Sequence, residues 1–214
     1  MYQRIDGEEW RHVFIVGDLH GCLSELISQL KLHHFDYHQD LLISVGDLID
    51  RGANSPGCLA LLGSKWFKAV KGNHEAMALE ALDEGEGMLW QMNGGEWYRE
   101  LPEQRQNNVQ LALLKCRDLP LVIELHTHDK TLVIAHADYP SGHYSWNQPV
   151  DEHLLVWSRD RLNKNLQGRG EDIDGADEFY FGHTPLKEVS HFHNQYYIDT
   201  GAVFGNKLTM VQVQ

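Results

Sequence analysis

Short apolar runs separated by helical patterns dominate the first third of the 214-residue chain. The runs predict three strands, over residues 12–17, 41–45 and 66–70. Between and after them, apolar residues recur at helical spacing, which predicts helices beginning near Leu23, Leu59 and His74. Alternating β and α units of about 30 residues favour right-handed crossovers and parallel strands. Because the strands are apolar on both faces, we expect this sheet to be covered on both sides.

The middle and the last third of the chain follow other patterns. Residues 84–118 are polar and rich in Trp and Gly, and predict a helical insertion that ends before Pro120. Such an insertion could lie over a site, but it is more often a surface excursion. Two apolar runs over 121–136 flank a polar turn and predict a hairpin. Further strands are predicted over residues 178–184, 189–194, 195–204 and 207–214. We therefore expect one α/β domain over 1–214, with a mostly parallel first half and an antiparallel second half.

The composition limits the compartment and the partners. Hydrophobic residues make up 42% of the chain, which is enough for one sizeable core. No apolar stretch is long enough for a membrane span, so none is expected, and residues 1–14 lack the basic-then-apolar pattern of a secretory signal. The three cysteines, Cys22, Cys58 and Cys116, are expected to be reduced thiols in a cytoplasmic protein. A net charge of −13 argues against nucleic acid and anionic membranes as partners.

Polar residues that can bind metals follow the first three predicted strands. Asp18 and His20 follow the first strand, Asp47 the second and Asn73 the third. Open α/β sheets bind ligands at the carboxyl ends of their strands, and the glycines in these segments allow close approach. If the strands are neighbours, these side chains converge at one edge of the sheet.

Two later strands also end in histidine, at His136 and His183. The six candidate ligands are then two aspartates, one asparagine and three histidines. Mixed oxygen and imidazole donors suit Mn, Fe, Zn or Ni better than Ca. Six donors are too many for one four-coordinate zinc site and suit two metals. Asp47 is the best candidate for a bridging carboxylate, because it comes from the middle member of the repeat.

These motifs resemble those of a known family. The segments "GDLHG", "GDLIDRG" and "GNHE", followed by "AH" and "GHT", resemble the calcineurin-like metallophosphoesterases. "GDLIDRG" with "GNHE" is the form found in serine/threonine protein phosphatases. "MNGGEW", "AHADYP", "FGHTP" and "YIDTGAVF" are similar to the group typified by the bacteriophage lambda phosphatase. The resemblance covers nearly the whole chain and implies a two-sheet β-sandwich flanked by helices.

The resemblance also implies a division of the ligands between two metals. Asp18 and His20 are expected to bind the first metal, Asp47 to bridge, and Asn73, His136 and His183 to bind the second. Mn²⁺ is the metal that the family implies, with Fe, Zn or Ni as alternatives. A hydroxide shared by the two metals is then expected to attack phosphorus directly, without a phosphoenzyme.

The remaining catalytic roles are carried over in the same way. His74 is expected to protonate the leaving oxygen, with Asp50 as the carboxylate that orients it. Arg51 and Arg159 are expected to bind the phosphoryl oxygens, with Arg161 as a competitor for the second role. Asp199 could orient a ligand histidine or serve as a turn residue. Histidines 143, 191 and 193 are expected not to be ligands.

Three functions are compatible with these residues. The first is a phosphatase acting on phosphoserine and phosphothreonine in proteins, with phosphotyrosine left open. The second is a symmetrical dinucleoside-tetraphosphate hydrolase. Such enzymes typically lack the aspartate of the "DRG" triplet and read "GNHD", so Asp50 and Glu75 favour the phosphatase. The third is an inactive phosphoprotein-binding module, which the complete set of site residues argues against.

Overall fold

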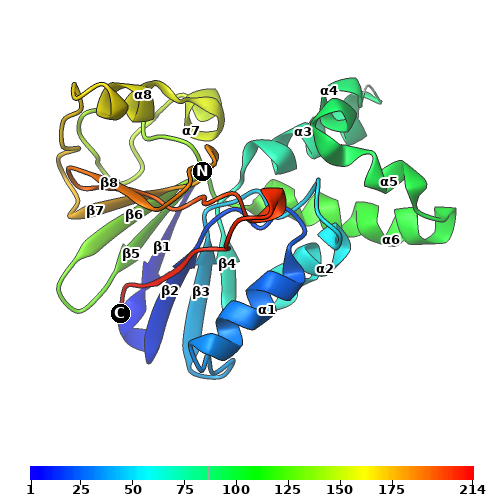
Figure 1. Cartoon of the computed structure of the whole chain (residues 1–214), viewed down its shortest axis with the longest axis horizontal. Coiled ribbons are helices and arrows are strands. Elements are labelled where there is room, and N and C mark those ends of the chain that lie inside the picture. The colour runs from blue at the N-terminus through cyan, green and yellow to red at the C-terminus, as the bar shows by residue number, and fades with distance from the viewer. Residues whose placement is uncertain (86) are drawn as a thin grey trace.

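The computed structural model describes residues 1–85 and 87–214, and it shows two β-sheets packed face to face with helices on both outer sides (Figure 1). The four-stranded sheet has the order β10-β2-β3-β4. Its strands are β10 (Met210–Gln212), β2 (His12–Val16), β3 (Asp40–Ser44) and β4 (Phe67–Ala69). Strands β2, β3 and β4 are parallel, as predicted, and β10 joins β2 antiparallel.

The six-stranded sheet has the order β1-β5-β6-β7-β9-β8. Its strands are β1 (Tyr2–Asp6), β5 (Val122–His126), β6 (Thr131–Ala135), β7 (Glu178–Phe181), β9 (Gln195–Tyr197) and β8 (Ser190–Phe192). The predicted hairpin is confirmed as the antiparallel pair β5–β6. The expectation of an antiparallel second half is wrong, because β1–β5, β6–β7 and β7–β9 are parallel pairs. Strand β9 lies between β7 and β8, so only its β8 neighbour is antiparallel.

Helices cover the outer face of the four-stranded sheet. They are α1 (Leu23–Leu32), α2 (Ser55–Ala60), α3 (Asn73–Glu84) and α6 (Glu103–Leu114). Phe14 and Leu42 of the sheet pack against Leu26 of α1 and Met77 of α3 in one buried cluster. Between α3 and α6 lie the short helices α4 (Met88–Trp90) and α5 (Trp97–Glu100), with a π-helical turn η3 (Gln91–Gly95). The predicted insertion is thus helical; Glu86, which belongs to it, lies outside the described residues.

Two helices that the sequence pattern did not predict, α7 (Glu152–Trp157) and α8 (Asp160–Leu166), cover the outer face of the six-stranded sheet. Leu155 and Leu162 of these helices pack against Phe179 of β7. Short 3-10 turns complete the chain, at Gly7–Glu9 (η1), Leu61–Gly63 (η2), Lys115–Asp118 (η4) and Ala202–Phe204 (η5).

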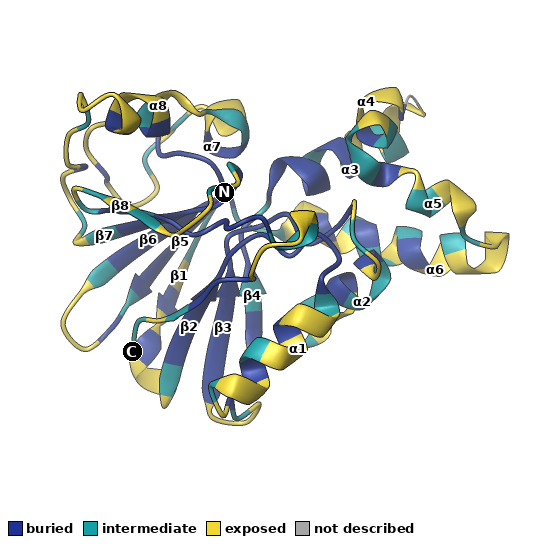
Figure 2. Cartoon of the chain, in the orientation of Figure 1, coloured by how far each residue is buried: buried dark blue, intermediate teal, exposed yellow. Residues whose placement is uncertain are grey.

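A third buried cluster fills the space between the two sheets. In β3, Leu41 and Ile43 point into this layer and Leu42 points to the helices, as the two-residue period of a strand requires. Figure 2 shows β2 and β3, the central strands of the four-stranded sheet, buried along most of their length, as expected for strands covered on both faces. The three cysteines are free and buried. Within the described residues, no helix combines the length and apolarity needed to cross a bilayer.

Candidate metal centre and active site

The six predicted metal ligands lie together at the carboxyl ends of five strands. Each follows β2, β3, β4, β6 or β7, and none has more than 7% of its surface exposed. The residues are Asp18, His20, Asp47, Asn73, His136 and His183. The six side chains therefore form a buried polar cluster at this edge of the sheets.

Asp47 lies at the centre of this cluster. Its carboxylate is 3.5 Å from Nε2 of His20 on one side and 3.4 Å from Nε2 of His136 on the other. The cluster contains two groups of three residues, and within each group the potential ligand atoms all lie within 4.8 Å of one another. The first group is His20, Asp47 and His74, and the second is Asp47, His136 and His183. Because Asp47 belongs to both groups, it is the carboxylate best placed to bridge two cations.

Asn73 and two histidines form the second half of the cluster. The side-chain oxygen of Asn73 lies 2.9 Å from Nε2 of His136 and 3.0 Å from Nδ1 of His183. Nδ1 of His136 is hydrogen-bonded to the backbone carbonyl of Val45, at 2.8 Å. In the same way, Nδ1 of His20 contacts the carbonyl of Ile49. Backbone contacts of this kind orient ligand imidazoles, and here they leave Nε2 facing the cluster.

Asp18 takes a more peripheral position. Its carboxylate accepts the backbone N–H of His183 at 3.1–3.2 Å, and it belongs to neither group of three. A side chain at Gly182 would collide with this carboxylate, so the glycine permits the approach. The assignment of Asp18 and His20 to one metal stays a prediction.

The electrostatics of the cluster favour bound cations. Burial and the nearby Asp199 raise the pKa of Asp18 well above its ordinary value. Burial opposes protonation of His136, but the Asp47 carboxylate outweighs it and raises the pKa of His136 to about 10. Burial lowers the pKa of His20 to about 4 and that of His183 to about 3. Bound cations would relieve the burial and the carboxylate repulsion that favour the protonated form of Asp18, and the Asp47 charge that favours the protonated form of His136. The mixed oxygen and imidazole donors suit divalent transition metals.

The backbone around the cluster is strained. Eight described residues other than glycine have a positive φ, and five of them are His20, Asp47, Asp50, Arg51 and His183. Such conformations cost on the order of 1–3 kcal/mol each and concentrate at functional sites. The sharp turns that end β2, β3 and β7 therefore aim side chains into the cluster at a cost in stability.

Glu75 joins the turn after β3 to the turn after β4. Its buried carboxylate accepts the backbone N–H groups of Asp47 at 3.0 Å, Leu48 at 2.8 Å and Gly72 at 2.9 Å. Burial and the nearby Asp47 raise the pKa of Glu75 to about 7. The sequence motif marked Glu75 only as a family feature, whereas the structure shows that it fixes the loop after β3 to the start of α3.

His74 and Asp50 form a buried pair beside the cluster. Nδ1 of His74 lies 2.6 Å from Oδ2 of Asp50, and the two residues are 1% and 0% exposed. Nε2 of His74 faces Asp47 Oδ2 at 3.9 Å. The imidazole thus contacts its carboxylate partner with one nitrogen and points the other at the metal cluster.

Two tryptophans of the insertion reach Asp50. Nε1 of Trp90 donates to both carboxylate oxygens, at 3.0 and 2.9 Å, and Nε1 of Trp97 donates to Oδ1 at 2.7 Å. The expectation that this insertion is a surface excursion is therefore wrong. Its indoles lie against the buried pair, and sequence reasoning missed both residues.

Arg51 and Arg159 lie next to the ligand histidines, whereas Arg161 binds groups that hold the fold together. Nη1 of Arg51 lies 2.6 Å from Nε2 of His20. Nε of Arg159 donates to Oγ1 of Thr184 at 3.1 Å, beside His183, and the side chain is otherwise exposed. Arg161 instead donates to the Asp138 carboxylate and to two backbone carbonyls, all at 2.8 Å. Arg161 is thus committed to the fold, which favours Arg159 as the second phosphate-binding residue.

The remaining polar candidates lie outside the central cluster. The Asp199 carboxylate accepts the backbone N–H of Gly201 at 2.9 Å, which fits a turn residue. His191 stacks on Tyr196 with ring centres 4.1 Å apart.

A cavity of about 570 Å³ opens between Gly52 and the helices α5 and α6, with Trp97 in its wall. None of the six predicted ligands lines this cavity, so it is distinct from the metal cluster.

Comparison with known proteins places the chain among phosphoesterases. "Serine/threonine-protein phosphatase 1" of Salmonella typhimurium is 50% identical over 214 residues, which cover 100% of this chain and 97% of that protein. "Serine/threonine-protein phosphatase 2" of Escherichia coli is 43% identical over 213 residues, covering 100% and 98%. An asymmetrical bis(5'-nucleosyl)-tetraphosphatase of Oceanobacillus iheyensis is 28% identical over 218 residues, covering 91% and 86%.

The fold is shared with solved phosphatases of low sequence identity. The crystal structure of a cold-active protein-tyrosine phosphatase from a psychrophilic Shewanella species aligns with a TM-score of 0.63 at 16% identity. That alignment covers 100% of this chain and 78% of the other. Residues 11–210 match the family profile described as calcineurin-like phosphoesterase. The chain therefore belongs to the calcineurin-like phosphoesterase family.

Proposed function

We propose that this protein is a metal-dependent phosphatase that hydrolyses phosphoserine and phosphothreonine monoesters in proteins. The observation that carries the proposal is the buried His74–Asp50 pair facing a double ligand cluster that shares Asp47. The names of relatives at 50% and 43% identity support the same activity.

The residues present fit two divalent cations. Asp18 and His20 would hold one, Asn73, His136 and His183 the other, and Asp47 would be shared. Bound cations would neutralise phosphoryl oxygens and acidify the attacking water. Mn²⁺ is the metal that we propose first, because the family resemblance implies it; the mixed oxygen and imidazole donors suit it and also suit Fe, Zn or Ni. In the present structure Arg51 contacts Nε2 of His20, so we expect Arg51 to move away when a cation binds that nitrogen.

The protein's own groups would act on both sides of the phosphorus. Arg51 and Arg159 would donate to the equatorial oxygens, where charge gathers during transfer. His74 would give its Nε2 proton to the serine or threonine oxygen as the P–O bond breaks. Asp50 would hold the Nδ1 proton and keep the ring in that orientation.

Hydrolysis of dinucleoside tetraphosphates is the second candidate function. The observation in its favour is the 28% identity with a tetraphosphatase, which is named as asymmetrical, not symmetrical as the motif comparison anticipated. Asp50 argues for the phosphatase, because a general acid assists most when the leaving group is a basic alkoxide.

A substrate comparison separates these functions. Protein reconstituted with Mn²⁺ is tested on a phosphoserine peptide, a phosphotyrosine peptide, diadenosine tetraphosphate and p-nitrophenyl phosphate. The proposal expects the highest kcat/KM on a phosphopeptide. A preference for the dinucleotide would overturn it in favour of the second function. No turnover of any substrate, with two metals bound, would indicate an inactive phosphoprotein-binding module.

A further inference from the structure

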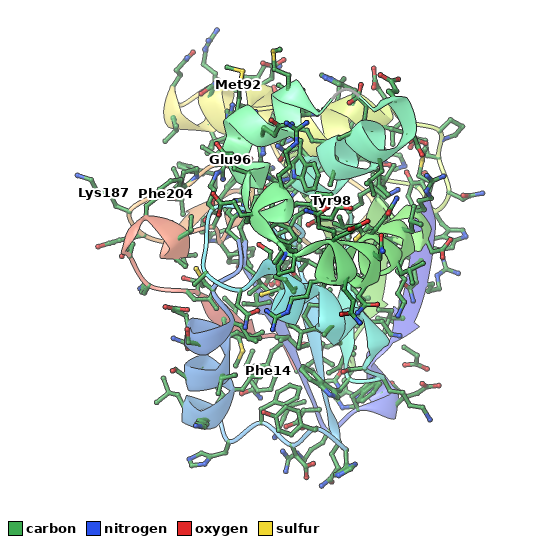
Figure 3. All side chains as sticks on the ribbon, turned by 90° about the vertical axis from the view of Figure 1, so that its right-hand side faces the viewer. Phe14, Met92, Glu96, Tyr98, Lys187 and Phe204 are labelled. Atoms are coloured by element: carbon green, nitrogen blue, oxygen red, sulfur yellow. The ribbon has the colours of Figure 1, made fainter. Side chains whose placement is uncertain are left out.

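The helical insertion supplies two hydrogen-bond donors to the buried His74–Asp50 pair. Trp90 is 4% exposed and Trp97 is half-buried, and both point their indole nitrogens at the Asp50 carboxylate. Figure 3 looks onto the insertion, in which Met92, Glu96 and Tyr98 are labelled. Trp90 lies 40 positions after Asp50 in the chain, and Trp97 lies 47 positions after it.

The contacts leave the Asp50 carboxylate with three N–H donors. Oδ2 receives Nδ1 of His74 at 2.6 Å and Trp90 at 2.9 Å, and Oδ1 receives Trp97 at 2.7 Å. An indole N–H can only donate and does not titrate near neutral pH. Donors of this kind supply hydrogen-bond partners to both oxygens of a carboxylate whose burial without partners would be costly. They also fix the direction in which Oδ2 faces the imidazole.

The "MNGGEW" segment is shaped for this contact. Gly94 has a φ of +104°, and its carbonyl accepts the backbone N–H of Arg51 at 3.1 Å. A Cβ at Gly94 would lie 2.7 Å from Cγ of Arg51, and a Cβ at Gly95 would lie 2.6 Å from the Trp90 ring. The two glycines therefore let the insertion seat directly on residues 50 and 51. This close seating brings both indoles to the carboxylate.

We propose that Trp90 and Trp97 are positioning residues for the general acid His74 and act through Asp50. The inference rests on the proposed phosphatase function, in which His74 Nε2 gives its proton to the departing oxygen. The indoles hold the carboxylate so that it orients the imidazole ring through Nδ1. Removing an indole N–H leaves the metal ligands in place but weakens proton donation to the leaving group.

The test compares leaving groups. Trp97→Phe and Trp90→Phe keep an aromatic ring and remove the donor. Each variant is assayed with phenyl phosphate, whose leaving group needs a proton, and with p-nitrophenyl phosphate, whose leaving group needs little help. We expect kcat to fall about tenfold or more on phenyl phosphate and less than about threefold on p-nitrophenyl phosphate, since general acids contribute roughly 10²–10⁴-fold in total.

Three variants calibrate the result. His74→Asn and Asp50→Asn define the leaving-group dependence when the acid or its partner is removed. Trp66→Phe is the matched control, because Trp66 is also half-buried but packs on Phe35 and Tyr37 and makes no contact with the pair. Metal content per chain and the thermal unfolding midpoint are measured for every variant.

The outcomes separate this inference from the proposed function. Equal loss on both substrates, or no loss, in a Trp97→Phe variant with two metals bound would overturn the inference, even if His74→Asn shows the leaving-group effect. Failure of the unaltered protein on every phosphopeptide would instead overturn the proposed function. If Trp90→Phe does not fold, Trp97→Phe decides the matter, because that side chain is less buried.

Discussion

Nδ1 of His74 and Oδ2 of Asp50 lie 2.6 Å apart in the interior, although 24 residues separate them in the chain. His74 lies in the first turn of helix α3, whereas Asp50 belongs to the strained turn after β3. A short buried contact between an imidazole and a carboxylate fixes both the orientation and the protonated nitrogen of the ring. The opposite nitrogen, Nε2, is then the atom free to exchange a proton with substrate.

Replacement of His74 by asparagine tests this role. We expect kcat on a phosphoserine peptide to fall by roughly 10²–10⁴-fold, because the leaving oxygen loses its proton donor. Metal content per chain, measured by elemental analysis, should stay nearly unchanged. Since His74 Nε2 is 3.9 Å from Asp47 Oδ2, loss of both metals in this variant would make His74 a ligand instead.

Asp47→Asn should remove metal from both halves of the cluster. The Asp47 carboxylate is the group shared by the two ligand sets, so its charge and its second oxygen serve both cations. We expect metal content to fall from about two to below one per chain, as two-metal sites of this type depend on such shared ligands. His143→Asn is the control, since His143 is exposed and outside both sets. Retention of two metals by Asp47→Asn would contradict the bridging assignment.

Arg159 and Arg161 should respond differently to substitution by alanine. Arg159→Ala should lower kcat/KM on phosphopeptides by at least about tenfold, since removing one positioned donor to a reacting oxyanion costs up to roughly 10²–10³-fold. Its unfolding midpoint should barely change, because the side chain is exposed. Arg161→Ala should instead lower the midpoint, since Asp138 and two carbonyls lose their donor. The reverse pattern would assign the phosphate contact to Arg161.

Much of the fold follows from the local sequence pattern, and the strand predictions that failed concern pairings that depend on distant parts of the chain. The apolar runs placed β2, β3 and β4 within one or two residues, because a strand buried on both faces needs such a run. Strand β1 mixes polar and apolar residues and pairs with β5, about 120 positions away, so no neighbouring pattern indicates it. Likewise, β8 and β9 form a hairpin, but which of them lies beside β7 depends on packing across the sheet.

In the candidate site, too, local pattern predicted some residues, whereas others are placed only by tertiary packing. Asp18, Asp47 and Asn73 could be found because each follows a strand directly, and parallel strands bring their carboxyl ends together. Trp90 and Trp97 could not, because their contact with Asp50 depends on how the insertion folds back over the sheet. Helix α7 did carry a signal: Asp151 caps it by accepting the N–H groups of His153 and Leu154.

The Arg11–Asp40 pair should make stability depend on acid pH. Burial alone would raise the pKa of Asp40, but two hydrogen bonds from Arg11 and one from the Asp36 N–H outweigh it, so the net pKa is lowered. A group with a depressed folded-state pKa contributes stability above its unfolded pKa, near 4, and loses it as pH falls through the folded value. Urea unfolding between pH 6 and pH 2, an interval of about four units around that value, should therefore show a flatter profile for Asp40→Asn than for the unaltered protein. Asp172→Asn, an exposed control, should follow the unaltered profile; an equally steep profile for Asp40→Asn would contradict the assignment.

Gly72→Ala should weaken the metal site without removing any ligand. Gly72 has an ordinary φ of −93°, so only space forbids a side chain there: a Cβ would collide with Oδ1 of Asp47 and lie 2.5 Å from its backbone nitrogen. Overpacking of this kind costs about 1–3 kcal/mol, and here part of the cost should appear as a metal affinity about tenfold lower, because Asp47 is displaced. Gly63→Ala and Gly142→Ala are matched controls, since neither added methyl meets an atom within 4 Å. Titration with Mn²⁺ should rank Gly72→Ala well below both controls; equal affinities would mean that the carboxylate of Asp47 does not set metal binding.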